Sequence, residues 1–137
     1  MRNVAPKQTS EPSGGYTVHT RSWEAIVGFY HDLIWNGWPL LPMLRVVEAI
    51  ASSPVASQIH GATSMDTLLL SDREDFGTAD NTLQITYQFD ERTFHFHHRD
   101  NSSGLDDGKV CTEAEVMQTL RLFLRLKYGI LFEVPWS

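Results

Sequence analysis

Apolar residues in the first half of the chain recur with the spacing of helices. Residues 22–36 place them at steps of three and four, which predicts one apolar face of an α-helix. Ser22 can cap the first turn through its hydroxyl, and Gly37 marks the end of the helix. A second helix is predicted over residues 42–53, which begin with a proline, because proline is tolerated in a first helical turn. Pro54 then either begins a short third helix or bends the chain.

The middle of the chain shows the alternation of β-strands instead. Residues 67–70 form a short apolar run, and residues 82–100 contain two arms in which apolar and polar side chains alternate. A two-residue loop at Glu91-Arg92 would join these arms into a hairpin. This dipeptide is poor in such turns, so a longer loop of the same parity stays open. The two-residue loop predicts three pairs on the apolar face: Phe89 with Phe94, Tyr87 with Phe96, and Ile85 with His98.

A further helix is predicted over residues 112–128. It opens with Thr-Glu-Ala-Glu, which is a capping box, and Gly129 supplies the stop. Leu122 and Leu126 lie outside its main apolar face, so the helix is either sandwiched between layers or part of a subunit contact. We expect a homodimer through this surface. The alternative is that residues 130–134 form a last strand or fold back and cover both leucines.

Together these elements predict an α+β fold. Their order is α-α-β-β-β-α, which is typical of an antiparallel sheet of about three to four strands with helices packed on one face. The chain of 137 residues fits a single domain over residues 16–137, preceded by a flexible tail at residues 1–15 that is rich in Pro, Ser and Gly. The polar stretches at residues 72–81 and 101–107 are expected to be loops.

Negative charge is concentrated in the middle of the chain. The net charge is −6, and residues 61–108, with ten acidic and three basic side chains, carry the whole excess. Nucleic-acid binding requires a basic surface, so direct binding of DNA or RNA is not expected. An acidic patch instead attracts a basic protein or a cation. The acids are densest along the two predicted loops, and the first three are candidate partner-binding residues: Asp72, Glu74, Asp75, Asp80, Asp106 and Asp107.

Cysteine content and hydropathy indicate a compartment. Cys111 is the one cysteine of the chain, so no disulfide can form within it, which favours a reducing compartment. Residues 1–15 lack the apolar core of a signal peptide, and no apolar run approaches the roughly 18 residues of a membrane span. We therefore expect a cytoplasmic protein that does not associate with membranes.

A short histidine cluster is the sharpest candidate for chemistry. His95 and His97 are two residues apart on a predicted strand, so both side chains point to its polar face, with Cα atoms roughly 6–7 Å apart. Two imidazoles at this spacing can share a zinc ion or supply a general base. A catalytic zinc site needs a third ligand, however, and no motif provides one. His98 falls on the apolar face and is predicted to be a hydrogen-bonded core histidine.

Aromatic residues offer a second kind of site. Trp35 and Trp38 flank a predicted turn, where full burial is difficult, so one of them is a candidate anchor for a protein partner. Aromatic side chains can also line a small-ligand pocket between helices and sheet. The candidates for that pocket are the hairpin phenylalanines together with Trp23, Tyr30, Trp35, Trp38 and Trp136.

Three functions are compatible with these features. The first is a small interaction or regulatory protein that is not an enzyme and binds a protein partner through its acidic β half and polar sheet face. The second is a metal-dependent or histidine-based enzyme that uses His95 and His97, with zinc as the metal. The third is a small-ligand-binding protein with an aromatic pocket. Because catalytic groups are sparse and the charge asymmetry is strong, the sequence favours the first function, without a cofactor.

Overall fold

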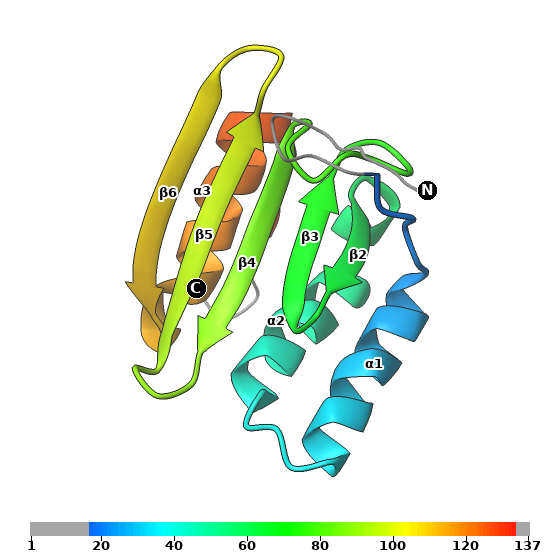
Figure 1. Cartoon of the computed structure of the whole chain (residues 1–137), viewed down its shortest axis with the longest axis vertical. Helices are drawn as coiled ribbons and strands as arrows, with labels where there is room; N and C mark the ends of the chain where they lie inside the picture. Colours follow the sequence, from blue (N-terminus) through cyan, green and yellow to red (C-terminus); the bar gives the residue numbers. More distant parts are fainter. Residues whose placement is uncertain (1–16, 134–137) are drawn as a thin grey trace, which may run out of the picture.

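A computed structural model describes residues 17–133 of the chain (Figure 1). The predicted tail at residues 1–15, as well as Val134 and Trp136, lies outside the described residues. In chain order the elements are α1 (Trp23–Trp35), α2 (Leu41–Ala51), the 3₁₀ helix η1 (Pro54–Ser57), β2 (His60–Ser64), β3 (Thr67–Ser71), β4 (Thr82–Gln88), β5 (Thr93–Asp100), β6 (Leu105–Thr112), η2 (Glu113–Glu115) and α3 (Val116–Tyr128). None of the described helices is long and apolar enough to cross a membrane.

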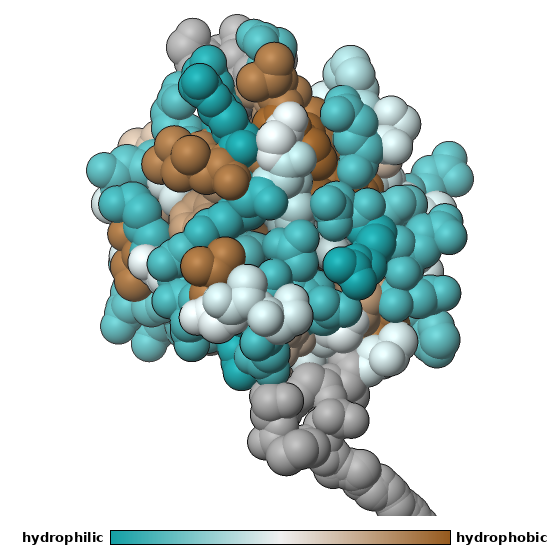
Figure 2. All heavy atoms as spheres, turned by 90° about the horizontal axis from the view of Figure 1, so that it is seen from above, coloured by the Kyte–Doolittle hydropathy of each residue, from teal (hydrophilic) through white to brown (hydrophobic). Residues whose placement is uncertain are grey.

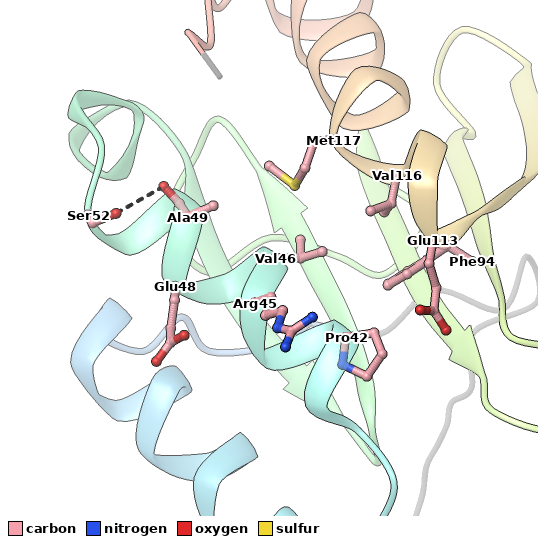
Figure 3. A pocket seen from close by; sticks show the side chains of 10 residues that line it. All are labelled: Pro42, Arg45, Val46, Glu48, Ala49, Ser52, Phe94, Glu113, Val116 and Met117. Atoms are coloured by element: carbon pink, nitrogen blue, oxygen red, sulfur yellow. Dashed lines mark hydrogen bonds between the residues drawn. The ribbon is translucent and has the colours of Figure 1, made fainter. Parts of the chain in front are cut away.

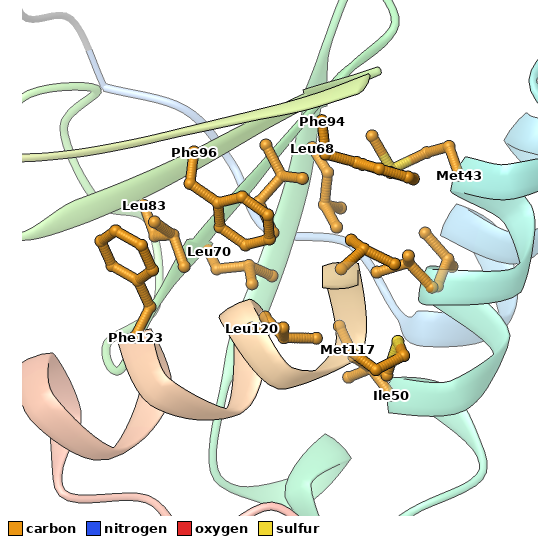
Figure 4. Close-up of a cluster of buried hydrophobic side chains, with 14 of the residues drawn as sticks. Met43, Ile50, Leu68, Leu70, Leu83, Phe94, Phe96, Met117, Leu120 and Phe123 are labelled. Atoms are coloured by element: carbon orange, nitrogen blue, oxygen red, sulfur yellow. The ribbon is translucent and has the colours of Figure 1, made fainter. Parts of the chain in front are cut away.

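The strands form one antiparallel sheet whose spatial order follows the sequence, with β2 and β6 at its edges. Helices α2 and α3 lie on the same side of this sheet (Figure 4). The predicted α+β class is confirmed, but the sheet has five strands where about three to four were predicted. The additional edge strands carry little apolar alternation: β2 reads HGATS and β6 reads LDDGKVCT.

The β4–β5 hairpin keeps the predicted faces but shifts the predicted pairs by two residues. Tyr87 pairs with Phe94, because residues 89–92 form a turn longer than the two-residue loop. Arg92 in this turn has a φ of 57°, in the left-handed region. Phe89 therefore lies in the turn and is 48% exposed, so its predicted place in the core is wrong.

The predicted helix signals act as expected. The Ser22 hydroxyl accepts a hydrogen bond from the Ala25 N–H at 3.1 Å at the start of α1. The capping box is formed at residues 112–115, which includes η2, and Gly129 ends α3 with a φ of 68°. Pro54 opens η1, so the chain takes the short third helix rather than a simple bend.

A hydrophobic core fills the space between the sheet and the helices (Figure 4). Phe96 of β5 stacks on Phe123 of α3, with ring centroids 5.4 Å apart. After α3 the chain folds back, and Ile130 and Phe132 are buried in the same core. Residues 130–133 form no strand, so the alternative of a terminal strand does not hold for these residues. They also leave Leu122 and Leu126 exposed.

Candidate functional site

The topology brings the two predicted acidic loops together at one end of the sheet. The β3–β4 loop and the β5–β6 turn leave the sheet at the same end (Figure 1). The backbone N–H of Asn101 donates to the carbonyl oxygen of Ala79 at 2.9 Å, which joins the two segments directly. We call this surface the acidic end and define it as residues 72–81 and 99–107, which hold seven acidic and two basic side chains. Figure 2 looks onto this end, where hydrophilic residues cover most of the surface.

Ion pairs compensate some carboxylates of the acidic end. Arg73 pairs with Asp80 at 3.2 Å. Asp106 and Asp107 lie at the start of β6 rather than in the predicted loop. Asp107 pairs with Lys127 of α3, and this contact lowers the pKa of Asp107. The other acids of the β3–β4 loop are exposed, and they are the three predicted partner-binding residues: Asp72, Glu74 and Asp75. Of these, Asp75 lies 3.3 Å from Nδ1 of His19.

A buried polar network holds the acidic loop on the sheet. Asn81, the last residue of the loop, has a φ of 54°. Its side-chain oxygen accepts a hydrogen bond from Nε2 of His98 at 2.8 Å, and its carbonyl oxygen accepts one from the Tyr128 hydroxyl at 2.8 Å. His98 is 1% exposed, which confirms the predicted core histidine. Burial, and then the charge of Lys127, lowers the pKa of His98, so the fold favours the neutral imidazole.

The candidate tryptophans lie at and after the end of α1, at the opposite end of the molecule, and Trp38 lies beside the β2–β3 turn. Trp35 is 89% exposed and Trp38 is 48% exposed. Trp38 lines an apolar hollow of about 490 Å³ together with Phe29 and Met65. We call Trp35, Trp38 and Met65 the aromatic end. The predicted partner-binding residues therefore belong to two separate surfaces and not to one.

His95 and His97 share the polar outer face of the sheet, as predicted, but each imidazole is directed to a different carboxylate. Nε2 of His97 pairs with Asp106, and Nε2 of His95 lies 3.8 Å from a carboxylate oxygen of Glu91. Within residues 17–133, no group of three or more His, Cys, Asp or Glu side chains is placed to hold a metal ion. The zinc hypothesis therefore gains no third ligand from the described part of the chain.

A groove between α2 and the start of α3 is a site that the sequence did not indicate (Figure 3). It has a volume of about 480 Å³, and its lining includes the apolar side chains of Phe94 and Met117. Glu113 also lines the groove and accepts hydrogen bonds from the Tyr87 hydroxyl and the Arg92 side chain, which lower the pKa of Glu113. Sequence patterns gave no signal for this groove because its walls come from distant parts of the chain.

Comparison with other proteins gives no family assignment. Neither a protein-family model, nor a curated protein, nor a solved structure matches this chain. The surfaces from which a function can be argued include the acidic end, the aromatic end, the α2–α3 groove and a polar hollow of about 490 Å³ on the outer sheet face, whose lining includes His95, His97 and Lys109.

Proposed function

We propose that this protein is a non-catalytic interaction protein that binds a basic protein partner through its acidic end. The observation that carries the proposal is the direct hydrogen bond from Asn101 to Ala79, which unites two acidic segments far apart in the sequence. The united surface holds seven acidic and two basic side chains. Carboxylates gathered in this way produce a local negative field, which attracts a cationic surface and speeds its encounter with the protein.

The polar outer face of the sheet extends this surface. Asp106 belongs to the acidic end and pairs with His97 on that face. Gln84 lies opposite His97 on the neighbouring strand, so polar side chains continue from the acidic end toward the middle of the sheet. A partner bound at the acidic end could form hydrogen bonds with these polar side chains of the sheet. We expect the interaction to take place in the cytoplasm, because Cys111 is the one cysteine of the chain.

Neutralising the exposed acidic loop should slow association with the partner. The triple variant is Asp72→Asn, Glu74→Gln and Asp75→Asn, and Asn at position 75 keeps an oxygen to accept the Thr20 N–H. We expect the association rate constant to fall roughly tenfold at low salt, with a much smaller change in dissociation. The measurement uses a partner captured with the wild-type chain from its native cell, identified by mass spectrometry and purified for surface binding kinetics.

A matched control variant tests whether the local electrostatic field of the acidic loop, and not the net charge of the protein, speeds association. Asp66→Asn, Asp90→Asn and Glu91→Gln change the net charge equally but lie in turns at the opposite end of the sheet. This control should associate at the wild-type rate. Equal slowing by both triple variants would contradict the proposal, as would a wild-type association rate that high salt leaves unchanged. Salt screens such fields over about 8 Å at physiological ionic strength.

A further inference from the structure

Within residues 17–133, the outer edge of β6 is open. β6 pairs with β5 at all eight of its positions, and no described strand lies beyond it. The other edge strand, β2, is partly covered by the segment before α1, because the Arg21 N–H donates to the Gly61 carbonyl oxygen at 2.9 Å. An uncovered edge presents a row of backbone N–H and C=O groups that can pair with a strand of another molecule.

Two exposed leucines of α3 lie beside this open edge. Leu122 is 48% exposed and Leu126 is 68% exposed. They share a helix side with Thr119, because residues three, four and seven positions apart lie close together around a helix. Thr119 lies next to the buried thiol of Cys111 on β6, whose pKa it affects, so this side of α3 is turned toward β6. The groove to α2 lies on the other side of the helix, at Met117.

We infer that a second copy of this chain occupies this surface, with the two β6 strands paired antiparallel in one continuous sheet. Side chains that face each other across a strand pair must share a sheet face. A twofold axis perpendicular to the sheet must therefore pass midway between the two copies of one residue, which then lie opposite each other. An axis at Gly108 places Asp107 of each copy opposite Lys109 of the partner subunit. An axis at Asp107 or at Lys109 would instead place like charges opposite each other. Among these three central positions, Gly108 is the one that places opposite charges together, and we take it as the position of the axis.

The same axis brings the α3 helices together. Asp107 pairs with Lys127, and Cys111 lies next to Thr119, so Gly108 on β6 lies level with the turn of α3 that carries the two leucines. A twofold axis perpendicular to the sheet then turns Leu122 and Leu126 of each copy toward those of the other. The dimer would bury apolar surface that the isolated chain leaves in water. It would leave the two acidic loops at residues 72–81 at opposite ends of the joined sheet, so the two proposals share only the β6 part of the acidic end, where Asp107 lies at the dimer contact.

A pair of cysteine variants tests the register. A Cβ built at Gly108 has one neighbour within 4 Å, the Phe96 carbonyl oxygen at 3.6 Å, so Gly108→Cys fits the fold. Cα atoms of directly opposed residues in antiparallel strands are about 4.5–5.5 Å apart, within the range of a disulfide. We expect wild type to be a dimer in light scattering at micromolar concentration. Mild oxidation should convert Gly108→Cys to a covalent dimer on a non-reducing gel.

Val110→Cys is the matched control. Val110 lies on the same face of β6 and is 56% exposed, so a thiol there is accessible. With the axis at Gly108, the two copies of position 110 are displaced by four residues along the strands, or roughly 13 Å, which is too far to bridge. Val110→Cys should therefore stay uncrosslinked. Crosslinking through position 110 and not 108, or monomeric wild type in light scattering, would overturn the inference.

A charge exchange tests the same register without a disulfide. Asp107→Lys and Lys109→Asp each place like charges opposite each other in a homodimer, so each variant alone should dimerise more weakly than wild type. An equimolar mixture restores two opposite-charge pairs and should form a heterodimer, detected by native mass spectrometry. Thermal unfolding verifies that each variant is folded, since Asp107 also pairs with Lys127. A mixture that associates no better than either variant alone would refute the register.

Discussion

His98 is buried, and only one of its two ring nitrogens has a hydrogen-bond partner among the described residues. Nε2 donates to the Asn81 side chain, whereas Nδ1 has no hydrogen-bond partner among the described residues. A second proton would sit on Nδ1 without an acceptor, which is costly in a buried site. Lys127 also disfavours the cation, and the carboxylates of Asp100 and Asp107 offset part of this effect, so the pKa of His98 is lowered.

The free energy of unfolding should therefore decrease as the pH falls below about 6.5, the ordinary pKa of histidine in an unfolded chain. Between that pKa and the lower pKa in the folded state, the unfolded chain binds more protons, so acid favours unfolding. The stabilisation is fully present above the unfolded pKa and is lost toward the folded one. Urea titrations at neutral pH and at about pH 5.5 measure this difference. His98→Gln should reduce it, and a pH dependence equal to that of wild type would exclude His98 as the cause.

The helix α1 and the strand β2 approach closely because Gly61 lacks a side chain. A Cβ there would lie 2.9 Å from Ile26 Cδ1 and 2.9 Å from the Trp23 ring. Neither neighbour can move freely, since Ile26 is fully buried and the Trp23 indole N–H donates to the Ile59 carbonyl oxygen. Gly28 within α1 is different, because a Cβ there would meet nothing within 4 Å.

Alanine at these two glycines should change stability in opposite directions. Gly61→Ala is expected to lower the free energy of unfolding by about 1–3 kcal/mol, because it overpacks the contact between α1 and β2. Gly28→Ala should raise it by about 0.5–1 kcal/mol, because alanine loses less backbone entropy in a helix. Urea unfolding of both variants measures the changes. A stabilising Gly61→Ala would show that the close approach of α1 to β2 has no steric limit.

The sequence predicted those helices and strands whose signals lie within the element itself, such as helical periodicity, capping residues and strand alternation. Periodicity and caps gave α1 and α3, and alternation gave the faces of the β4–β5 hairpin. The true register depends on the turn at residues 89–92, whose conformation the alternation does not encode. β6 is a strand because it pairs with β5 over its whole length, a contact that its polar sequence does not indicate. The candidate site was predictable to the same extent. The two charged loops were predicted, but their contact depends on the spatial order of the strands, which the local pattern does not give.

At the scale of the whole molecule, the sheet separates two surfaces of different chemistry. The acidic end and the aromatic end lie at opposite ends of the strands, so one small partner would not cover both. Both ends are carried by one hydrophobic core, which includes residues of α1, the sheet and α3 as well as Ile130 and Phe132. The segment after α3 is therefore part of the common core, although it has no regular secondary structure.

Phe132 tests whether this segment stabilises the whole molecule. Phe132 is 2% exposed in the core, whereas its neighbour Leu131 is 69% exposed. Phe132→Ala should lower the free energy of unfolding by about 3–5 kcal/mol, because it removes buried apolar atoms and leaves a cavity. Leu131→Ala should change it by less than about 0.5 kcal/mol. Because the core is shared, circular dichroism and tryptophan fluorescence should report one common thermal transition, shifted to lower temperature in Phe132→Ala. All variants are compared at one protein concentration, since dimerisation would add to the apparent stability. Two separate transitions in Phe132→Ala would mean that residues 130–133 stabilise α3 alone and not the contact between helices and sheet.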